Sequence, residues 1–336
     1  MRDRTLRVAV VNAGGWGTAL AVKLAKQGYR VALWARRPEL AQAISSDREN
    51  RGYLPGVEVP ETVSATADLE SCVSDADVVV LAVIASFMRD ASALLAPVVR
   101  SDALVVHGTK GLDPVTRERL SVVLARGLGC DEGRVAVLAG PNHAEEVARG
   151  LPAAAVLACA DSGVASELQA VLTTNQFRVY TNSDVAGVEL CSAAKNVVAI
   201  AAGIGDGLGY GDNSKAALIT RALAELWRLV ERHGGSLTTV AGLAGIGDVV
   251  ATCTSRHSRN RWAGEQIGRG RSIDDIVRST PMVIEGIPST RAIVELAQEV
   301  GVEMPICESV YRVLFDGQLP DEALRELMSR GSTSEG

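Results

Sequence analysis

The sequence predicts an α/β domain with a mostly parallel, doubly wound sheet, followed by an all-α domain. Before about residue 180, short runs of β-branched residues alternate with amphipathic stretches, a pattern typical of a parallel sheet with helices on both faces. From about residue 185 onward the strand signal ends and helical periodicity continues. A chain of 336 residues also exceeds the length at which one hydrophobic core usually stops growing, about 250–300 residues. We therefore predict domains at 1–188 and 189–330, with a small, polar, disordered tail at 331–336.

The strands of the first domain are predicted where short apolar runs occur, at 7–11, 31–34, 78–83, 104–106, 135–138 and 153–157. Helices between them are predicted from amphipathic stretches at 18–27, 87–99 and 115–126. In the second domain, helical spacing of apolar residues covers 188–205, 215–233, 263–269, 273–279, 289–300 and 306–315. Strands that alternate with helices in this way are expected to lie parallel to one another.

The composition favours a soluble globular protein and argues against two function classes. Hydrophobic residues make up 47% of the chain and charged residues 22%, an ordinary balance for soluble domains. The net charge of −6 argues against a general nucleic-acid binder, because phosphate recognition usually shows as an excess of basic residues. The longest apolar stretch, 78–85, is far too short to span a membrane, so we expect no integral membrane segment.

The cysteines and histidines indicate neither a disulfide framework nor a metal site. The six cysteines are scattered without a C-x-x-C pair, and the four histidines lack the spacing of metal ligands. The first apolar run, 8–11, is too short for the core of a signal peptide. We therefore expect a reduced, cytoplasmic protein without a bound metal.

The first predicted strand runs directly into a glycine-rich turn, 12–21, where dinucleotide-binding folds carry G-x-G-x-x-G. Such a turn aims the backbone N–H groups of a helix N-terminus at a pyrophosphate. Gly14 would let the backbone approach the phosphates, and Gly17 would let the helix pack closely on the strand. Asn12 takes the place of the first glycine, and asparagine tolerates left-handed backbone angles better than most residues. The alternative is a glycine-rich turn that binds no ligand.

Two arginines, Arg36 and Arg37, follow the second predicted strand. An NAD-selective site carries an acidic residue here for the ribose 2′-hydroxyl. Guanidinium groups instead suit a 2′-phosphate. The sequence therefore predicts NADP or NAD as cofactor, with NADP at least accepted. The alternative is that both arginines are solvated surface charges.

Lys195 is a lone ammonium in a helical segment, 193–204, that is otherwise almost wholly apolar. A helix that is apolar on every face is normally buried, and a lysine is rarely buried without a partner. We infer that its amine opens into an enclosed polar cavity, where desolvation would lower its pKa toward values useful for acid–base chemistry. The alternatives are that Lys195 reaches the surface or pairs with a structural carboxylate.

Further polar residues follow the later strands and interrupt the helical domain. Lys110 and the run Gly140-Pro141-Asn142 come after predicted strands, at the carboxyl edge where open α/β sheets bind ligands. Gly247-Asp248 places a carboxylate in an apolar, glycine-rich context, and Ser258-Arg259-Asn260-Arg261 collects hydrogen-bond donors suited to a phosphate. Taken singly, Asp248 fits a cap or turn and 258–261 fits a solvated helix start. Together with two lysines beside a dinucleotide fold, they form a more specific set.

These residues together resemble the bacterial-type NAD(P)-dependent glycerol-3-phosphate dehydrogenases over nearly the whole chain. The most specific matches are residues 15–20, 109–112, 140–141, 195–197, 201–204, 209–213, 247–248, 252–255, 258–260 and 283–286. The resemblance implies a Rossmann domain followed by a helical domain, often as a homodimer. It also implies reversible hydride transfer between a nicotinamide ring and carbon 2 of dihydroxyacetone phosphate, which gives sn-glycerol 3-phosphate for phospholipid synthesis.

The resemblance assigns roles by motif position. Lys195 would be the general acid and base, while Lys110 and Asp248 would orient the substrate and the catalytic lysine. The substrate would be held by Lys110, Gly140, Asn142, Lys195, Asn196, Asp248, Ser258, Arg259 and Asn260. The dinucleotide would be held by Gly14, Gly15, Trp16, Gly17, Arg36, Arg37, Lys110, Ala144, Arg259, Val283 and Glu285. Elementary chemistry agrees, because hydride arrival at a carbonyl makes an alkoxide that a nearby ammonium stabilises and protonates.

The chain departs from the usual family pattern at four places: Asn12, Gly15, Ile84-Ala85 and Asn142-His143. All four lie near the expected cofactor cleft. Two other functions stay open. A β-hydroxyacid dehydrogenase shares the layout and a catalytic lysine but takes a carboxylate substrate, and the donors at 258–260 argue against it. A non-catalytic dinucleotide-binding protein is the second, and the presence of both Lys110 and Lys195 argues against it.

Overall fold

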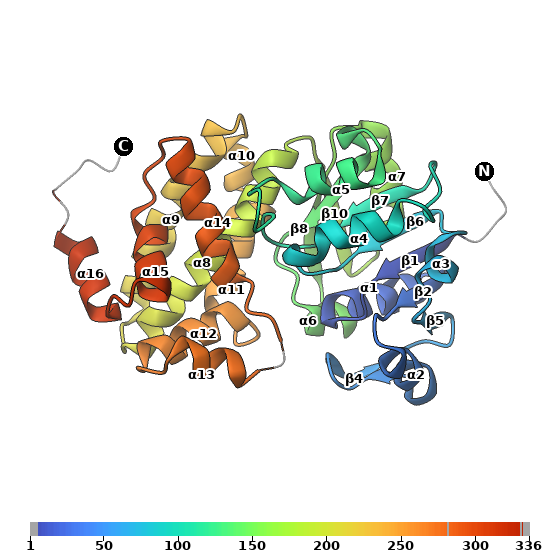
Figure 1. Ribbon diagram of the computed structural model, residues 1–336, viewed down its shortest axis with the longest axis horizontal. Coiled ribbons are helices and arrows are strands. Elements are labelled where there is room, and N and C mark those ends of the chain that lie inside the picture. The colour runs from blue at the N-terminus through green and yellow to red at the C-terminus, as the bar shows by residue number, and fades with distance from the viewer. Residues whose placement is uncertain (1–5, 281, 330, 332–336) are drawn as a thin grey trace. The chain divides into compact units, whose positions relative to one another are not determined.

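The computed structural model describes residues 6–280, 282–329 and 331. The chain divides into two compact units, residues 1–113 with 118–189 and residues 114–117 with 190–336. The first unit holds a sheet covered by helices, and the described part of the second consists of helices (Figure 1). This confirms the predicted fold class. Of the predicted tail at 331–336, all but Gly331 lies outside the described residues.

The sheet of the first unit has the strand order β10-β9-β8-β7-β6-β1-β2-β5. Neighbouring strands are parallel except for β8 and β9, which are antiparallel. The chain fills one side of β1 with β2 and β5 and then crosses to β6 on the other side. Ligands of such sheets bind at the carboxyl ends of the strands, near the point where the order reverses. The strands are β1 (Arg7–Val11), β2 (Arg30–Trp34), β5 (Val63–Thr66), β6 (Val78–Leu81), β7 (Leu104–His107), β8 (Val135–Ala139), β9 (Ala153–Ala158) and β10 (Phe177–Asn182).

All six predicted strands are present, but the two edge strands, β5 and β10, were not predicted. Strand β10 buries Phe177 and Val179 and exposes Arg178 and Tyr180 between them. An edge strand is covered less completely than a central one, so its sequence lacks a continuous apolar run. A separate short hairpin, formed by β3 (Glu49–Asn50) and β4 (Leu54–Glu58), also escaped prediction.

Helices cover both faces of the sheet, as the strand composition predicts. Along β1, Val8 and Val10 pack into one apolar cluster, whereas Ala9 and Val11 pack into the other. This alternation follows from the two-residue repeat of a strand. The first cluster is completed by α1 (Gly15–Ala25), α2 (Pro38–Asp47), α6 (Ala144–Ala148) and α7 (Ser162–Leu172), and the second by α3 (Leu69–Val73), α4 (Met88–Leu95) and α5 (Leu120–Leu128).

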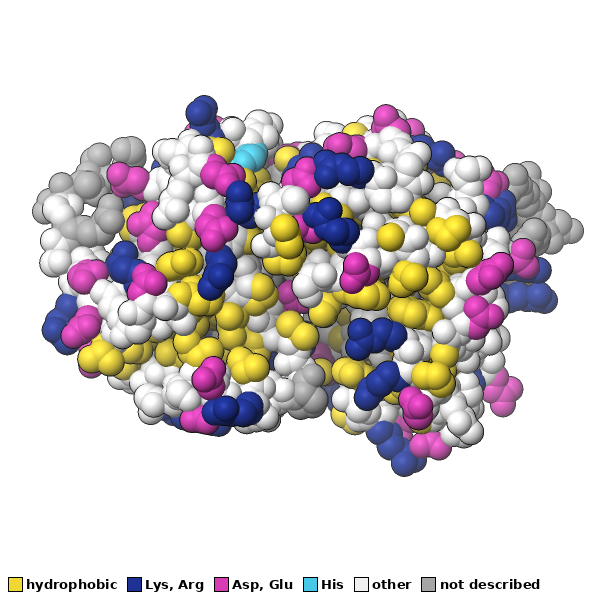
Figure 2. Space-filling model, in the orientation of Figure 1, with side chains coloured by type: hydrophobic (Ala, Val, Ile, Leu, Met, Phe, Trp, Pro, Cys, Tyr) yellow, Lys and Arg dark blue, Asp and Glu magenta, His cyan; other side chains and the backbone are white. Residues whose placement is uncertain are grey.

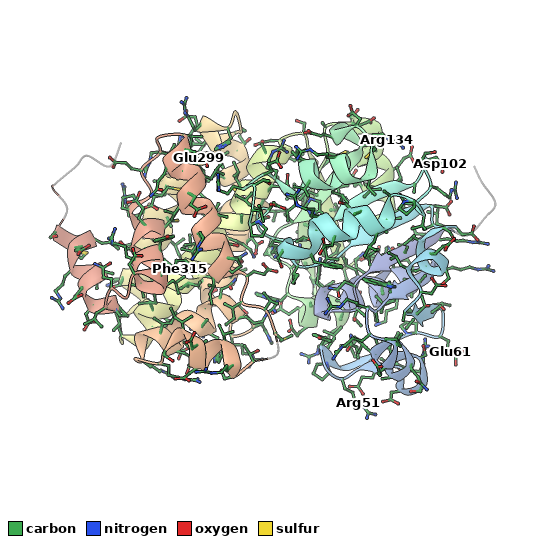
Figure 3. All side chains as sticks on the ribbon, in the orientation of Figure 1. Arg51, Glu61, Asp102, Arg134, Glu299 and Phe315 are labelled. Carbon is green, nitrogen blue, oxygen red and sulfur yellow. The ribbon has the colours of Figure 1, made fainter. Side chains whose placement is uncertain are left out.

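The prediction that a helix starts at residue 115 was wrong, because α5 begins at Leu120. The preceding residues form a tight loop in which Leu112 bridges to Arg119 and Arg117 has a left-handed φ of 62°. Residues 114–117 at the tip of this loop belong to the second unit. There Arg117 forms ion pairs with Glu295, at 3.3 Å, and with Glu299, the last residue of α14 (Gly286–Glu299) (Figure 3).

The second unit contains every helix predicted for this part of the chain and several more. Its elements are the remainder of α8 (Val185–Gly207), then α9 (Asp212–Arg232), α10 (Leu237–Val240), a π-helical turn η3 (Leu243–Gly247), α11 (Asp248–Thr254), α12 (Arg259–Gly268), α13 (Ile273–Arg278), α14, α15 (Pro305–Phe315) and α16 (Pro320–Ser329). Helix α8 starts in the first unit and continues into the second. On α15, the ring centroids of Phe315, labelled in Figure 3, and Tyr311 lie 4.9 Å apart, with the ring planes tilted by 56°.

Two helical segments are long and apolar enough to cross a membrane by length and composition alone, Val185–Gly207 and Leu237–Thr254. In the first, 83% of the most apolar window is buried inside the protein. The core helix of a soluble protein passes the same test. On the face that Figure 2 shows, basic and acidic side chains are interspersed around apolar ones.

Helices α8 and α12 touch through their backbones at glycines. A Cβ atom on Gly203 would lie 2.0 Å from the carbonyl oxygen of Arg261, and one on Gly264 would lie 2.1 Å from that of Ile200. Gly207 and Gly268, one turn further along each helix, meet the facing backbone in the same way. Real Cβ atoms do not approach a backbone oxygen this closely, so the contact requires glycine. The helix that carries Lys195 is thereby held directly against α12.

Candidate active site

The glycine-rich turn between β1 and α1 has the geometry that a dinucleotide site requires. Asn12 adopts a left-handed φ of 93°, and its side-chain nitrogen donates to the carbonyl oxygen of Ala82 at 2.8 Å. A Cβ atom on Gly17 would lie 2.0 Å from the Asn12 carbonyl oxygen, and one on Gly15 would lie 2.8 Å from that of Tyr53. The turn leads into the N-terminus of α1, where Gly14 is the N-cap. Such a terminus presents backbone N–H groups to an anion.

Trp16 packs into the loop that follows β7. A Cβ atom on Gly108 would lie 2.5 Å from Nε1 of Trp16, so the indole rests directly on the backbone of that loop. The N-terminal turn of α1 and the loop that bears Lys110 are therefore neighbours. Lys110 is half-buried in this loop, and the adjacent Thr109 donates its hydroxyl to the carbonyl oxygen of Val83 at 2.8 Å.

The two arginines after β2 are exposed, as both the 2′-phosphate role and the alternative of solvated surface charges require. The guanidinium of Arg36 lies 6.0 Å from the ring centroid of Phe87, and Arg37 donates to the hydroxyl of Tyr53 at 3.4 Å. Within the described part of the chain, neither guanidinium forms an ion pair. Both keep donors available for an anionic ligand.

The loop after β8 carries Gly140, Asn142 and, at the start of α6, Ala144. Gly140 has a φ of 122°, a backbone conformation that favours glycine. The side-chain amide of Asn142 lies among the backbone carbonyl oxygens of residues 139, 141 and 154. Because β7 and β8 are parallel to β1, their following loops lie at the same edge of the sheet as the glycine-rich turn.

In the second unit, Lys195 is buried and belongs to a compact polar cluster. Its side chain is 4% exposed, and Nζ donates to Oδ1 of Asp248 at 2.5 Å and to Oγ1 of Thr252 at 2.9 Å. Thr252 also donates to Oδ1 of Asp248, at 3.1 Å. Lys195 thus does not reach the surface, and the carboxylate that pairs with it is a residue the sequence already singled out. We call these three residues the Lys195 cluster.

Sequence reasoning missed the part that Thr252 plays in this cluster. The residue appeared only within a family match, although its position four residues after Asp248 places both on one face of a helix. That spacing was the available signal. Cys253, the next residue, is also buried, and burial raises the pKa of its thiol to about 12, so it stays protonated and is a poor nucleophile.

The π-helical turn η3 ends at Gly247, directly before α11. It therefore determines the residue at which α11 begins and the direction of the Asp248 side chain. Gly245, inside this turn, has non-helical backbone angles of φ −89° and ψ −105°. A Cβ atom there would lie 1.9 Å from the carbonyl oxygen of Val240, so only glycine fits. Asp248 and Thr252 then occupy the first and second turns of α11, both buried and both facing Lys195. Single π-helical turns often occur at functional sites.

The residues predicted to hold a phosphate are joined to other partners within the second unit. Asn260 donates to Oδ1 of Asn196 at 2.9 Å and accepts from the backbone N–H of Gly286 at the same distance. Ser258 is the N-cap of α12 and accepts from the backbone N–H of Arg261. Arg259 is exposed and donates to the carbonyl oxygen of Val283 at 2.8 Å. Of the three predicted phosphate ligands, Arg259 therefore keeps the most donors for a ligand.

Comparisons with known proteins decide the family. The family profile described as "NAD-dependent glycerol-3-phosphate dehydrogenase N-terminus" matches residues 7–165, and the corresponding C-terminus profile matches residues 184–325. This chain belongs to the NAD-dependent glycerol-3-phosphate dehydrogenase family. The predicted resemblance is confirmed.

Members of this family with similar sequences cover almost the entire chain. A protein of Chlorobium limicola named "Glycerol-3-phosphate dehydrogenase [NAD(P)+]" is 48% identical over 97% of this chain and 98% of its own length. A protein of the same name from Moorella thermoacetica is 49% identical over 98% and 97%. The crystal structure of glycerol-3-phosphate dehydrogenase from Coxiella burnetii aligns with a TM-score of 0.92 and 38% identity, over 97% of this chain and 99% of that one.

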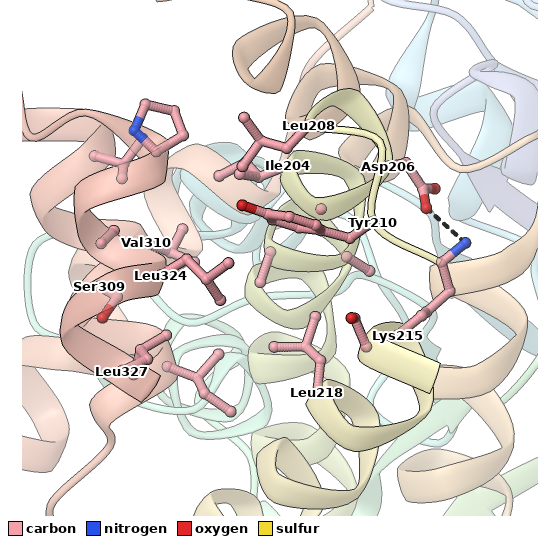
Figure 4. Close-up of a pocket in the computed structure, with 18 of the residues that line it drawn as sticks. Ile204, Asp206, Leu208, Tyr210, Lys215, Leu218, Ser309, Val310, Leu324 and Leu327 are labelled. Carbon is pink, nitrogen blue, oxygen red and sulfur yellow. Dashed lines mark ion pairs between the residues drawn. The ribbon is translucent and has the colours of Figure 1, made fainter. Parts of the chain in front are cut away.

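The second unit also holds an apolar pocket that none of the predicted site residues lines (Figure 4). It spans about 660 Å³, counting the space open to solvent, between the end of α8, the start of α9, α15 and α16. Ile204, Leu218, Val310 and Leu324 supply much of its wall. Asp206 and Lys215 form an ion pair of 2.7 Å at its edge. A wall of this composition does not suit the small phosphorylated substrates of this family.

Proposed function

We propose that this chain catalyses the reversible, NAD(P)H-dependent reduction of dihydroxyacetone phosphate to sn-glycerol 3-phosphate, a precursor of phospholipids. Lys195 is the general acid in this direction and the general base in reverse. Membership of the glycerol-3-phosphate dehydrogenase family supports the reaction. The single observation that supports the role of Lys195 is its burial in hydrogen-bond contact with Asp248 and Thr252. No other lysine of the second unit has this setting: Lys215 lies at the edge of the apolar pocket and pairs with Asp206.

The residues of the first unit fit a dinucleotide. Both positions 15 and 17 are glycine, and a Cβ atom at either would clash with a backbone oxygen, that of Tyr53 or of Asn12, so the tight turn before α1 needs both. We assign pyrophosphate binding to this turn, with the other dinucleotide contacts at Trp16, Arg36, Arg37, Lys110, Ala144, Arg259, Val283 and Glu285. When bound, the dinucleotide supplies or accepts the hydride.

Lys195 supplies the proton that balances the reaction. As a hydride adds to carbon 2 of the substrate, negative charge develops on the carbonyl oxygen, and Lys195 transfers a proton from Nζ to that oxygen. Asp248 holds the ammonium in place before transfer. After transfer, Lys195 is neutral and Thr252 still donates to the buried Asp248 carboxylate. Solvent then returns the proton to Lys195, and the reverse reaction runs through the same positions.

The phosphate of the substrate anchors a very small molecule at a distance from its reacting carbon, which fixes its orientation. We assign this anchoring to Arg259 with the neighbouring Ser258 and Asn260. Lys110, Gly140, Asn142 and Asn196 complete the substrate site in this proposal. Asn196 and Asn260 act as a pair, because each already bonds the other.

A direct assay tests the function. Purified protein is mixed with NADPH or NADH and dihydroxyacetone phosphate, and absorbance of the reduced nicotinamide is followed. We expect oxidation with this ketone and none with 3-oxo carboxylates, the oxidised forms of β-hydroxyacids. Oxidation with carboxylates alone would favour a β-hydroxyacid dehydrogenase. Tight NADPH binding without turnover of either substrate would favour a non-catalytic dinucleotide-binding protein.

We further propose that Arg36 recognises the 2′-phosphate of NADP. Arg36→Ala is expected to weaken NADP(H) binding by about 10-fold or more, because a charge-assisted hydrogen bond contributes about 1.5–3 kcal/mol. NAD(H) binding should change much less. Fluorescence titration with NADPH and NADH measures both dissociation constants. Equal weakening of the two would mean that Arg36 does not read the 2′-phosphate.

A matched control is Arg134→Ala. Arg134 is exposed like Arg36 but precedes β8, at the amino edge of the same sheet (Figure 3). Its removal changes the net charge equally and should leave both dissociation constants unchanged.

We also infer that the protein is a cytoplasmic homodimer. All six cysteines are free, which suits a reducing compartment. The second unit exposes large apolar side chains such as Leu319, at 60%, and Met328, at 79%, which a subunit contact would cover. Sedimentation equilibrium should give about twice the chain mass. A monomer at micromolar concentration would contradict the dimer.

A further inference from the structure

Glu189 is a fully buried acid that the proposed mechanism does not use. It lies near the start of α8, is 2% exposed, and belongs to the first unit. Its carboxylate accepts three hydrogen bonds: from Oγ of Ser121 at 2.5 Å, from the backbone N–H of Ser121 at 2.9 Å, and from the guanidinium of Arg119 at 3.3 Å. Nε2 of His107 lies 3.4 Å from Oε1 of Glu189, the oxygen that also accepts from the backbone N–H of Ser121.

These partners come from both ends of one loop, residues 108–119 between β7 and α5, which we call the Lys110 loop. His107 is the last residue of β7 and is completely buried, directly before the loop that bears Lys110. Arg119 and Ser121 stand at the other end of that loop, at the start of α5. The single carboxylate of Glu189 therefore joins the strand that leads into the loop to the helix that leads out of it. The bridge between Leu112 and Arg119 narrows the loop further.

The charge of Glu189 is maintained despite its burial. Burial alone would raise the pKa of Glu189, but the His107 ring beside it and two hydrogen bonds from Ser121 hold that pKa below its usual range. A buried carboxylate is costly unless donors surround it. A neutral side chain could fill the same space with a smaller desolvation penalty. Packing alone therefore does not explain why a carboxylate is buried here.

Glu189 also fixes the start of the helix that carries Lys195. Both residues lie on α8, six positions apart, which corresponds to about 9 Å along a helix that rises 1.5 Å per residue. The helix is continuous between them. A displacement at Glu189 would therefore move Lys195 with it.

We propose that Glu189 is a positioning residue, whose buried carboxylate holds both ends of the Lys110 loop and the second turn of α8, the helix that carries Lys195. This inference rests on the proposed function, since it concerns the two lysines assigned to the reaction. Glu189 touches neither substrate nor dinucleotide in this proposal. It acts by keeping Lys110 and Lys195 where the substrate needs them.

The test is Glu189→Gln, which keeps the size of the side chain and removes its charge. The amide NH₂ then faces donors on Ser121 and Arg119, so the loop is released. We expect kcat with dihydroxyacetone phosphate to fall about 10- to 100-fold, the loss that a misplacement of about 1 Å produces. The KM for the ketone and the dissociation constant of NADPH should rise by less than kcat falls, because Lys110 is only one of several binding residues in the proposed sites. An unchanged kcat in the folded variant would overturn the proposal.

The matched control is Glu225→Gln in the same protein. Glu225, on α9, is also buried and accepts the backbone N–H of Ile306 at 2.8 Å, at the start of α15, although burial raises its pKa to about 7. It bonds no residue of the Lys110 loop or of α8 in the described chain. Its replacement should alter thermal stability without lowering kcat. A similar fall in kcat for both variants would mean that any buried acid has this effect, which would overturn the special role of Glu189.

A second measurement separates this inference from the proposed function. Amide hydrogen exchange of the wild type and Glu189→Gln is compared for peptides from 108–119 and from the start of α8. We expect exchange there to be at least tenfold faster in the variant and unchanged elsewhere. If the wild type reduces no ketone, the proposed function fails. Exchange then still decides whether Glu189 anchors the loop, and unchanged exchange would overturn the anchoring. Should Glu189→Gln not fold, Ser121→Ala, which deletes one hydroxyl donor, carries both measurements.

Discussion

Lys195→Met is expected to lower kcat for reduction of dihydroxyacetone phosphate by about 10²–10⁴-fold, the usual contribution of a positioned acid or base. The proton that balances hydride addition would then have to come from water. NADPH binding should be nearly normal, because the dinucleotide contacts that we propose lie mostly in the first unit. Steady-state kinetics and fluorescence titration measure the two effects. Unchanged turnover would remove Lys195 from the mechanism.

The structure adds a complication, since Lys195 neutralises a buried carboxylate. Removing one partner of a buried ion pair typically costs about 3–5 kcal/mol of stability, because the remaining charge is left without its partner. The double variant Lys195→Met, Asp248→Asn removes both charges and should recover much of that stability. It should not recover activity. Recovery of turnover together with stability would show that the single variant failed through unfolding.

Lys215→Met is the control for loss of a lysine in the second unit. Like Lys195, Lys215 pairs with an aspartate, but its side chain is 22% exposed, against 4% for Lys195, and it borders the apolar pocket. Asp206 keeps a second cation in Arg261 when Lys215 is lost. The variant should fold and retain kcat within about threefold, far less than the 10²–10⁴-fold loss expected of Lys195.

Gly203→Ala is expected to lower the free energy of unfolding by about 2–3 kcal/mol, the upper range for overfilled contacts. The added methyl group would meet the backbone of Arg261 at 2.0 Å, and a backbone cannot rotate away as a side chain does. Helices α8 and α12 would have to separate. Differential scanning calorimetry should show a fall in the unfolding midpoint of roughly 3–4 °C.

Gly205→Ala provides a control on the same helix. A Cβ atom there meets only Tyr210, at an ordinary distance of 3.9 Å. Because alanine forms helix better than glycine by about 1 kcal/mol, this variant should be as stable as the wild type or more so. Equal destabilisation at positions 203 and 205 would show that the helix contact does not depend on glycine.

The strands predicted correctly from the sequence are those whose side chains are buried on both faces of the sheet and are therefore apolar throughout. Central strands such as β1 and β6 are buried on both faces, and every residue of β6 is buried. Strand β10 was not predicted, because half of its side chains face solvent and its sequence therefore has no continuous apolar run. The helix forecast at 115 failed because the left-handed Arg117 and the bridge between Leu112 and Arg119 are tertiary features that periodicity does not report.

The candidate site was also predicted in part. Lys195 was conspicuous because a charge in an apolar helix needs an explanation. Thr252 was not, since a threonine fits many places and only the fold brings its hydroxyl to Nζ of Lys195. The pairing of Asn196 with Asn260 joins residues far apart in the chain, which no local pattern encodes. The π-helical turn before Asp248 likewise depends on the close approach of Gly245 to Val240.

The short loop tip at 114–117, whose Arg117 is tied to Glu295 and Glu299, affects how this protein can recombine with its relatives. A chimaera made by a single crossover within α8 would join one parent's tip to the other parent's α14. Exchange of the two intact units therefore needs three junctions, one within α8 and one on each side of residues 114–117. Grafts that ignore the tip should lose the Arg117 pairs whenever the donor differs at positions 295 and 299.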